Sequence, residues 1–376
     1  MHIDIIPRKR ELYTMLKSIN NRIVFLDYMR IFAFVSVVIG HRYYSQEIQA
    51  LSTDLTVHIT IRTFLDLITP LVYGGAAGVI IFFLTSGYII THVLQTENTL
   101  DFYVKRIFRI YPLYVFALCV ELLMNWGIKD IPVPPLASLV PRFLLIGDFF
   151  NSDYGLAGVE WTLRVEILFY VFMGSLKYLG FINKPSTLPY LFGAVGVLLY
   201  VLPAFPTKEI WSHGYFSIYF YFLLIGSCAY LAQAGLVSTR VCTTFSVLLF
   251  ILHIMKITEG QSSFLQSNYA IISMLIFFIS LRFQSAFVDS PVVRTLSDLT
   301  FSVYLLHQWV WSYLLIFISP LGISERAASL IIIPAILLIS YCSHKWIEIP
   351  GIKLGKSVTK LIKGQQTLPP APAVKI

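Results

Sequence analysis

The first apolar segment of the chain contains two ionisable side chains, Arg30 and His41, eleven residues apart. Eleven positions of an α-helix return to within about 20° of the starting direction, so both side chains share one face, about 16 Å apart along the axis. An arginine inside a membrane segment is costly and by default belongs to a functional site. Arg30 lies about two turns inside the segment, so snorkelling to the membrane surface explains it only weakly.

A second concentration of charge follows at Lys105, Arg106 and Arg109. Arg106 and Arg109 are three residues apart and therefore share a helix face. Guanidinium groups offer forked donors and a permanent charge, which suit the binding of phosphate. A basic anchor that touches anionic lipid would need the same side chains, so the motif alone leaves both interpretations open.

A carboxylate, Glu166, shares a helix face with Tyr170 in a later apolar segment. Counted from the membrane surface, Glu166 should reach a depth similar to that of His41. A carboxylate beside an imidazole holds it in one tautomer and stabilises its protonated form, as in a general base that takes a proton from a hydroxyl. The alternative is a structural ion pair of Glu166 with Arg30 or Arg164.

Another apolar segment, near the end of the chain, carries Ser302, Tyr304 and His307. Tyr304 and His307 are three residues apart and share a helix face. In a membrane helix such side chains are more often interhelical hydrogen-bonding groups than catalytic groups. We expect this group in the inner half of the molecule, close to Arg30.

The composition predicts a membrane protein. The chain of 376 residues is 57% hydrophobic and only 13% charged, about half the charged fraction of an ordinary soluble domain. We expect an all-α, polytopic integral membrane bundle of about ten transmembrane helices. The expected segments are Val24 to Tyr43, Ala76 to Leu94, Ile110 to Trp126, Trp161 to Gly180, Leu188 to Phe205, Tyr215 to Leu231, Val241 to Met255, Asn268 to Leu281, Leu299 to Ile318 and Ala328 to His344. A further stretch, Leu136 to Phe150, should form a helix in an outer loop or a re-entrant piece.

The distribution of lysine and arginine predicts the orientation. Most of them fall on the side that holds both termini, which the positive-inside rule makes the cytoplasm. The net charge of +8 is then mostly this asymmetry, and it gives no reason to expect nucleic acid as a partner. We divide the chain into a basic cytoplasmic segment (1–22), a transmembrane domain (23–351) and a disordered cytoplasmic tail (352–376). The four cysteines show no C-x-x-C spacing and predict neither a metal site nor a disulfide.

Six segments carry or accompany these polar groups. They are LDYMRIFAFVSVVIGH (Leu26 to His41), FFLTSGYII (Phe82 to Ile90), KRIFR (Lys105 to Arg109), EWTLRVEILFY (Glu160 to Tyr170), FSVYLLH (Phe301 to His307) and WIEIP (Trp346 to Pro350). In this order and combination they resemble the motifs of the acyltransferase 3 family of membrane acyltransferases, with Arg30 and His41 matching the arginine and histidine of its first span. The departures are mild: Tyr88 stands where the family has phenylalanine, and Thr162 where serine is common.

The resemblance implies transfer of an acyl group, usually acetyl, from cytoplasmic acyl-CoA to a hydroxyl of a carbohydrate such as lipopolysaccharide O-antigen or exopolysaccharide, in the bacterial inner membrane. Acyl-CoA (acetyl-CoA), a carbohydrate acceptor and membrane lipids are the expected partners, and no metal is expected. The expected roles are general base for His41 with Glu166, phosphate binding for Arg106 and Arg109, a pantetheine passage lined by Arg30, Ser302, Tyr304 and His307, and oxyanion stabilisation by Trp161 or Tyr170.

Two other classes of protein also use ionisable groups within a membrane. A secondary transporter or exporter of lipid-linked sugar would bind a solute and protons through them, but it commonly has two related halves, and we find no internal repeat. A haem protein would use His41 and His307 as axial ligands. It is the weaker alternative, because the two histidines are expected at different depths.

Overall fold

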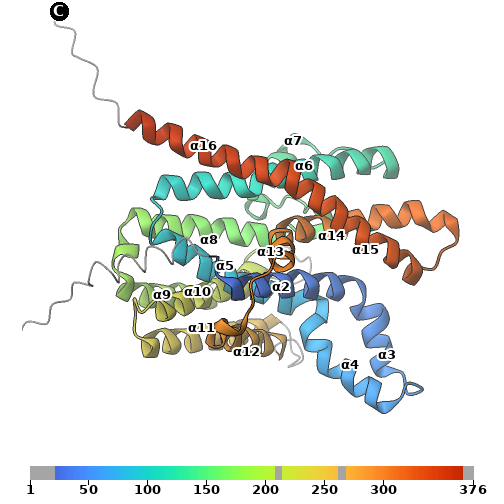
Figure 1. Ribbon diagram of the computed structural model, residues 1–376, viewed down its shortest axis with the longest axis horizontal. Coiled ribbons are helices and arrows are strands. Elements are labelled where there is room, and N and C mark those ends of the chain that lie inside the picture. Colours follow the sequence, from blue (N-terminus) through green and yellow to red (C-terminus); the bar gives the residue numbers. More distant parts are fainter. Residues whose placement is uncertain (1–21, 208–213, 261–267, 367–376) are drawn as a thin grey trace, which may run out of the picture.

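The computed structural model describes residues 22–207, 214–260 and 268–366, and these residues are helical or irregular, with no β-strand among them. The long helices lie roughly side by side along the long axis of the molecule (Figure 1). The α-helices are α2 (Val24–Arg42), α3 (Gln49–Thr53), α4 (Ile59–Val72), α5 (Ala76–Leu94), α6 (Thr99–Lys129), α7 (Leu136–Phe143), α8 (Trp161–Tyr178), α9 (Leu188–Val201), α10 (Tyr215–Gln233), α11 (Thr239–Gly260), α12 (Asn268–Arg282), α13 (Pro291–Asp298), α14 (Thr300–Ile318), α15 (Glu325–Ser343) and α16 (Ile349–Gln366). The all-α prediction is confirmed.

Within the described ranges, seven helical units are long and apolar enough to cross a membrane. Five of them are α2, α6, α10, α11 and α14, and the other two are longer units that join α4 to α5 and α15 to α16. The remaining expected segments are helical too: α9 and α12 are shorter, and α8 contains three charged side chains. The chain is therefore a multi-pass membrane protein. The count of ten spans and the cytoplasmic location of both termini stay predictions.

Helices α2, α5 and α10 make up the centre of the molecule, where α5 contacts both α2 and α10. The crossing of α5 and α10 is close because each helix contributes a glycine. A Cβ atom on Gly87 would lie 2.0 Å from the Leu223 carbonyl oxygen, and one on Gly226 would lie 2.1 Å from the Leu84 carbonyl oxygen. A side chain at either position would push the two backbones apart, since a packed interior has no room to absorb it.

The segment between α6 and α8 is held by buried charges. Arg164, whose side chain is 1% exposed, pairs with Asp148 at 2.7 Å and with Glu160 at 2.5 Å. Loss of one partner would leave an uncompensated buried charge, which makes such a network a strong local constraint. Helix α7 and a 3-10 turn at Gly147–Phe149 lie in this segment, so the expected helical piece between Leu136 and Phe150 is present.

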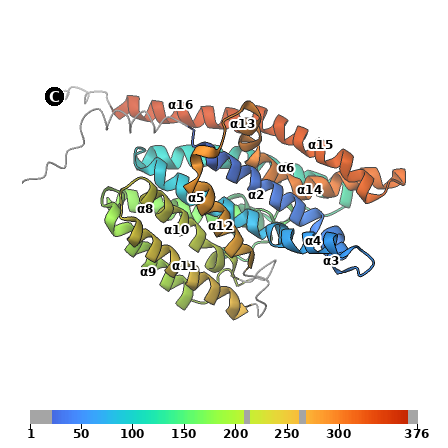
Figure 2. The same cartoon turned by 60° about the horizontal axis from the view of Figure 1, so that its bottom comes forward.

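The expected domain ends need one correction. Residues 1–21 lie outside the described residues, so the basic N-terminal segment is not described. Residues from 352 onward were expected to be a disordered tail, but the chain continues as helix α16 to Gln366. Helix α16 runs along α6 at one edge of the molecule (Figures 1 and 2), and Lys363 forms an ion pair with Asp101 there. The expectation missed this helix because α16 is stabilised by packing on α6, a tertiary contact that composition does not reveal.

A candidate active site of two cavities

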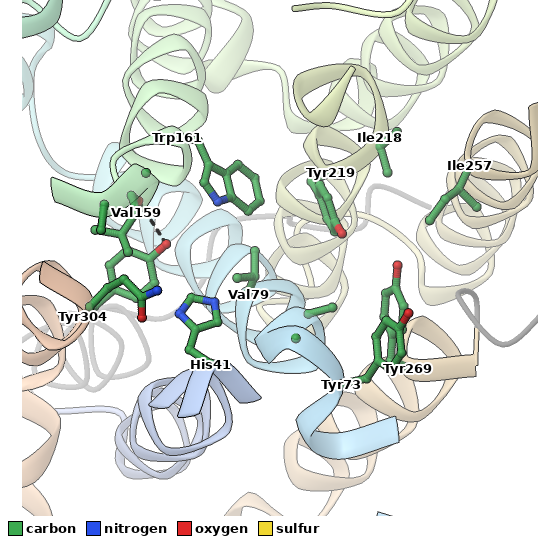
Figure 3. A pocket seen from close by; sticks show the side chains of 15 residues that line it. His41, Tyr73, Val79, Val159, Trp161, Ile218, Tyr219, Ile257, Tyr269 and Tyr304 are labelled. Carbon is green, nitrogen blue, oxygen red and sulfur yellow. Dashed lines mark hydrogen bonds between the residues drawn. The ribbon is translucent and has the colours of Figure 1, made fainter. Parts of the chain in front are cut away.

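His41 opens into a cavity of about 370 Å³, which we call the histidine cavity. It is bounded by the ends of α2, α10, α11 and α12, the start of α8, and the turns around Gly74 and Gly158. Figure 3 shows His41, Trp161 and Tyr304 on one side of this space and Tyr73, Tyr219 and Tyr269 on the other. The walls therefore combine one imidazole with large aromatic rings that carry hydroxyl or indole N–H groups.

The imidazole of His41 is hydrogen-bonded to that of His307. The two atoms are Nδ1 of His41 and Nε2 of His307, 2.9 Å apart. The second ring nitrogen of His307, Nδ1, lies 2.7 Å from the carbonyl oxygen of Tyr304. Our placement of Tyr304 and His307 with Arg30 in the inner half was wrong, because α2 and α14 pack together and bring both residues level with His41. The expectation that the two histidines lie at different depths was wrong for the same reason.

Close packing at the end of α2 sets the position of His41. A Cβ atom on the preceding Gly40 would lie 2.2 Å from the backbone nitrogen of Gly75, so only glycine lets α2 approach the turn before α5. On the other side of His41, Arg42 donates a hydrogen bond of 2.7 Å to the carbonyl oxygen of Gln308. The ring of His41 is thus fixed against both α5 and α14.

The turn that carries Gly158 and Val159 is positioned by hydrogen bonds from two helices, α6 and α14. Glu121 on α6 accepts hydrogen bonds from the backbone N–H groups of Leu156 (2.6 Å) and Ala157 (3.1 Å), which both have positive φ angles. Tyr304 on α14 donates to the Val159 carbonyl oxygen at 3.1 Å. A carboxylate that accepts from successive N–H groups stabilises such a turn well.

The Arg164 network supports the same wall of the histidine cavity. Tyr154 stacks on the Arg164 guanidinium, 4.1 Å from the ring centroid, and donates a hydrogen bond to Asp148 at 2.6 Å. Burial and this bond to the carboxylate raise the pKa of the Tyr154 phenol, so the phenol stays protonated and remains a donor. Tyr215 also donates to Asp148, and its ring lies 5.0 Å from that of Trp161.

A second cavity, of about 110 Å³, contains the other ionisable residues of the sequence motifs. We call it the arginine cavity because its lining includes Arg30 from α2 and both Arg106 and Arg109 from α6. Arg106 approaches Glu97 only to 3.9 Å, and its buried Nε has no hydrogen-bond partner among the described residues. Arg109 has no ion-pair partner in the described part of the chain. The cavity therefore holds an excess of positive charge.

Glu166 lies in the arginine cavity and not beside His41. Its Oε1 accepts hydrogen bonds from Ser86 and from Tyr170, both at 2.5 Å. The expected pairing of Glu166 with His41 is thus not what the structure shows, and the alternative ion pair with Arg30 or Arg164 is not formed either. Ser86 belongs to the FFLTSGYII segment, so the motif contained this partner although its contact was not foreseen.

The remaining expected residues separate between the two cavities. Trp161 lines the histidine cavity, but Tyr170 lines the arginine cavity and is too far along α8 to act beside His41. Ser302 lines neither of them. It is fully buried and donates a hydrogen bond of 3.0 Å to Glu348, which also bonds His344 at 2.9 Å. Ser302 thus connects α14 to the segment before α16, and its expected place along a pantetheine passage is wrong.

A narrow neck lies between the two cavities. It is a void of about 10 Å³ whose lining shares Val79 and Tyr304 with the histidine cavity and Phe82 and Thr300 with the arginine cavity. The rings of Phe82 and Tyr304 are parallel within 2° and 6.1 Å apart, and Thr162 donates to the Tyr304 hydroxyl at 2.8 Å. Sequence reasoning missed Thr162, Val79 and Phe82 as site residues, because apolar or small side chains give no chemical signal.

The membrane bundle thus contains a cavity rich in arginine and a cavity that places an imidazole among aromatic rings, with a narrow void between them. Comparison with protein families agrees with the sequence motifs: residues 23–345 match the acyltransferase domain model of the acyltransferase 3 family, and the chain belongs to this family. No curated protein and no solved structure gives a significant match to the chain.

Proposed function

We propose that this protein is an O-acyltransferase that moves an acyl group, most simply acetyl, from acyl-CoA to a hydroxyl of a carbohydrate. The observation that carries the proposal is the pair of cavities, one cationic and one with an imidazole among aromatic rings, which meet at the neck. Membership of the acyltransferase 3 family supports the reaction class. Acetyl-CoA as donor and O-antigen or exopolysaccharide as acceptor are the finer parts of the proposal.

The arginine cavity is the proposed entrance for the donor. Arg30, Arg106 and Arg109 offer permanent positive charge and forked donors, which suit the phosphates of CoA. The unpaired Nε of Arg106 supports a ligand there, since a buried donor without a partner is otherwise costly. The void of about 110 Å³ is too small for CoA as a whole, so only part of CoA would lie inside it.

The neck is the proposed path of the pantetheine arm toward His41. Arg30 and His41 are eleven residues apart on α2, a rise of about 16 Å, which suits an extended arm. The neck is narrow in the described structure, so passage requires Phe82 and Tyr304 to move apart. Side-chain rotations of this kind are common when a ligand binds.

In the proposed reaction, His41 Nε2 takes the proton from an acceptor hydroxyl while the hydroxyl oxygen attacks the thioester carbonyl carbon. The C–O bond forms, the C–S bond breaks, and the proton on His41 passes to the departing thiolate sulfur. CoA leaves as a free thiol. Trp161, which lines the same cavity, is the proposed donor that stabilises the developing oxyanion.

The aromatic walls of the histidine cavity support a sugar as acceptor. Tyr73, Tyr219, Tyr269 and Trp161 offer apolar ring faces together with hydroxyl and N–H groups. A sugar ring presents the matching combination of an apolar C–H face and a polar rim. With the basic end of the bundle in the cytoplasm of a bacterial inner membrane, this cavity would open toward the side where surface polysaccharides are assembled.

The test uses the purified, detergent-solubilised protein. We expect it to bind CoA and to hydrolyse acetyl-CoA slowly in the absence of an acceptor. Mass spectrometry of surface polysaccharide from cells with and without the gene product should then identify the acylated sugar. A transporter would neither bind CoA nor hydrolyse acetyl-CoA, so the absence of both properties would reject the acyltransferase function.

A further inference from the structure

His307 is buried beneath the proposed base and does not line the histidine cavity. His307 is only 1% exposed, and both of its ring nitrogens have hydrogen-bond partners. Nε2 faces His41 Nδ1 at 2.9 Å, and Nδ1 faces the Tyr304 carbonyl oxygen at 2.7 Å. A residue in this position has no access to substrate, so any role in the reaction is exerted through His41.

The two hydrogen bonds determine where the protons lie. A carbonyl oxygen only accepts, so His307 Nδ1 carries a hydrogen and donates it to Tyr304. A neutral imidazole has a single N–H group, which leaves His307 Nε2 as an acceptor. His41 Nδ1 must then be the donor of the bond between the rings. In the neutral pair, the remaining nitrogen of His41, Nε2, carries a lone pair and no proton.

We propose that His307 is a positioning residue that holds His41 in the tautomer whose unprotonated Nε2 is free to accept the proton of the acceptor hydroxyl. The inference rests on the proposed function, since it concerns the same reaction. The Tyr304 carbonyl is the fixed point of the arrangement, because a backbone carbonyl cannot become a donor. A serine protease uses a carboxylate to hold its histidine in the required tautomer, and a carbonyl-anchored imidazole does so here.

Neither imidazole is paired with a carboxylate of the described residues, and Glu166 is bonded to Ser86 and Tyr170 instead. A neutral imidazole stabilises the imidazolium form of its partner less than a carboxylate does, because it contributes no opposite charge. The main effect of His307 is therefore orientation.

Throughout the proposed step His307 keeps one proton. His41 gains a proton at Nε2 from the acceptor hydroxyl and gives it to the thiolate sulfur of CoA, while the Nδ1 hydrogen stays in the bond to His307. His307 could take this hydrogen only by giving up its own bond to Tyr304 or by becoming an imidazolium in a buried place. Proton transfer thus involves His41 and does not extend to His307. Both histidines return to their starting tautomers after each turnover.

Two substitutions of His307 separate its two hydrogen bonds. His307→Asn places an amide group at the level of Nδ1, which keeps a donor toward Tyr304 but leaves no acceptor for His41. His307→Gln places its carboxamide at the level of Nε2 and so offers His41 an oxygen acceptor. We expect His307→Asn to lower kcat about 10²-fold or more, as loss of the orienting partner does in a catalytic triad. His307→Gln should recover at least about tenfold of this loss.

Both variants should bind CoA as the wild-type protein does, since His307 lies outside the arginine cavity. Ser302→Ala, on the same helix and also buried, is the matched control and should retain activity. Equal turnover of the Asn and Gln variants at equal yield would show that His307 is only a packing residue, and unaltered turnover of the Asn variant would overturn the proposal as well.

A second measurement needs no variant to be functional. In wild-type protein labelled with ¹⁵N-histidine, NMR should show neutral His41 protonated at Nδ1 and neutral His307 protonated at Nδ1. A spectrum with His41 protonated at Nε2 would overturn the proposal even if acyl transfer is confirmed. Conversely, the protein could show the expected tautomers but neither bind CoA nor transfer acetyl. The arrangement of His41 and His307 would then be confirmed, and the proposed function would be rejected.

Discussion

Trp161 and Glu166 lie five residues apart on α8, yet they line different cavities. Five helical residues span about 7.5 Å, which is enough to carry the helix past the neck. Trp161 faces the space around His41, while Glu166 faces Arg30, Arg106 and Arg109. These two positions on α8 are therefore assigned to different steps of the proposed reaction, and substitutions at them should have different effects.

Substitution of Arg106 and Arg109 by alanine should weaken acyl-CoA binding. Each substitution removes one cation from the arginine cavity, in which Arg109 has no ion-pair partner among the described residues. Loss of one charge-assisted hydrogen bond to phosphate costs about 1.5 to 3 kcal/mol, roughly tenfold to a hundredfold in Kd, and the double variant should lose more. Isothermal titration with CoA measures the effect.

The matched control is Arg282→Ala, which removes an exposed arginine at the end of α12, outside both cavities. It should bind CoA as the wild-type protein does. If the double variant at Arg106 and Arg109 also binds CoA normally while its yield in the membrane falls, the two arginines are lipid anchors and the phosphate assignment is wrong.

Substitution of Glu166 by glutamine should increase the affinity for CoA, by up to about tenfold. The change removes the carboxylate charge beside the arginines while the amide keeps an oxygen that accepts from Ser86 and Tyr170. Titration with CoA and single-turnover kinetics measure the two effects separately. A slower chemical step with unchanged binding would instead support the role of partner to His41 that we first expected.

Much of this molecule could be predicted from the sequence. The length of the apolar stretches predicted the helices, and the order of the motifs predicted the family. The polar residues singled out in the sequence lie at cavities: Arg30, Arg106 and Arg109 gather in one, and His41 and Tyr304 line another, while their roles stay predictions. Each of these inferences used a local property, such as hydropathy, charge or helical spacing, which a single chain displays.

The pairing of side chains could not be predicted in the same way. The contact between His41 and His307 depends on how α14 lies against α2. The helix before α14, α13, is itself held to α2 by a hydrogen bond of 2.7 Å from Ser297 to Asp27, a contact between residues far apart in the sequence. Depth counted along a helix also failed for Glu166, because the start of α8 follows the turn that Glu121 stabilises. No local signal distinguishes Ser302, which bonds Glu348 in the segment before α16, from a residue that lines a cavity.

Ser302→Ala should destabilise the protein slightly and leave acyl transfer within about twofold of wild type. The substitution leaves Glu348 with one hydrogen-bond partner fewer, and a buried hydrogen bond of this kind contributes about 1 to 3 kcal/mol. Thermal unfolding in detergent measures the first effect, and acetyl transfer measures the second. A large loss of CoA binding in this variant would restore the passage role that the structure argues against.

His41→Gln should abolish acyl transfer while expression and CoA binding stay near normal. Loss of a general base commonly lowers the rate about 10²- to 10⁴-fold, and His41 lies at the end of α2, away from the arginine cavity. Acetyl transfer by the purified variant and CoA titration test the two parts. Wild-type transfer by this variant would end the mechanism proposed for the histidine cavity.

Ala33→Ile tests whether the two cavities work together. Ala33 is 3% exposed and lines the neck, so a larger side chain there should block the path of the pantetheine arm. Overpacking a core position lowers the free energy of unfolding by about 1 to 3 kcal/mol. The control is Ala328→Ile on α15, a fully buried position away from the neck, which should lose a similar amount of stability. We expect CoA to bind both variants, but acyl transfer to be lost only in Ala33→Ile. Equal activity of the two variants would mean that the acyl group reaches His41 by another route, and the arginine cavity would then no longer be its entrance.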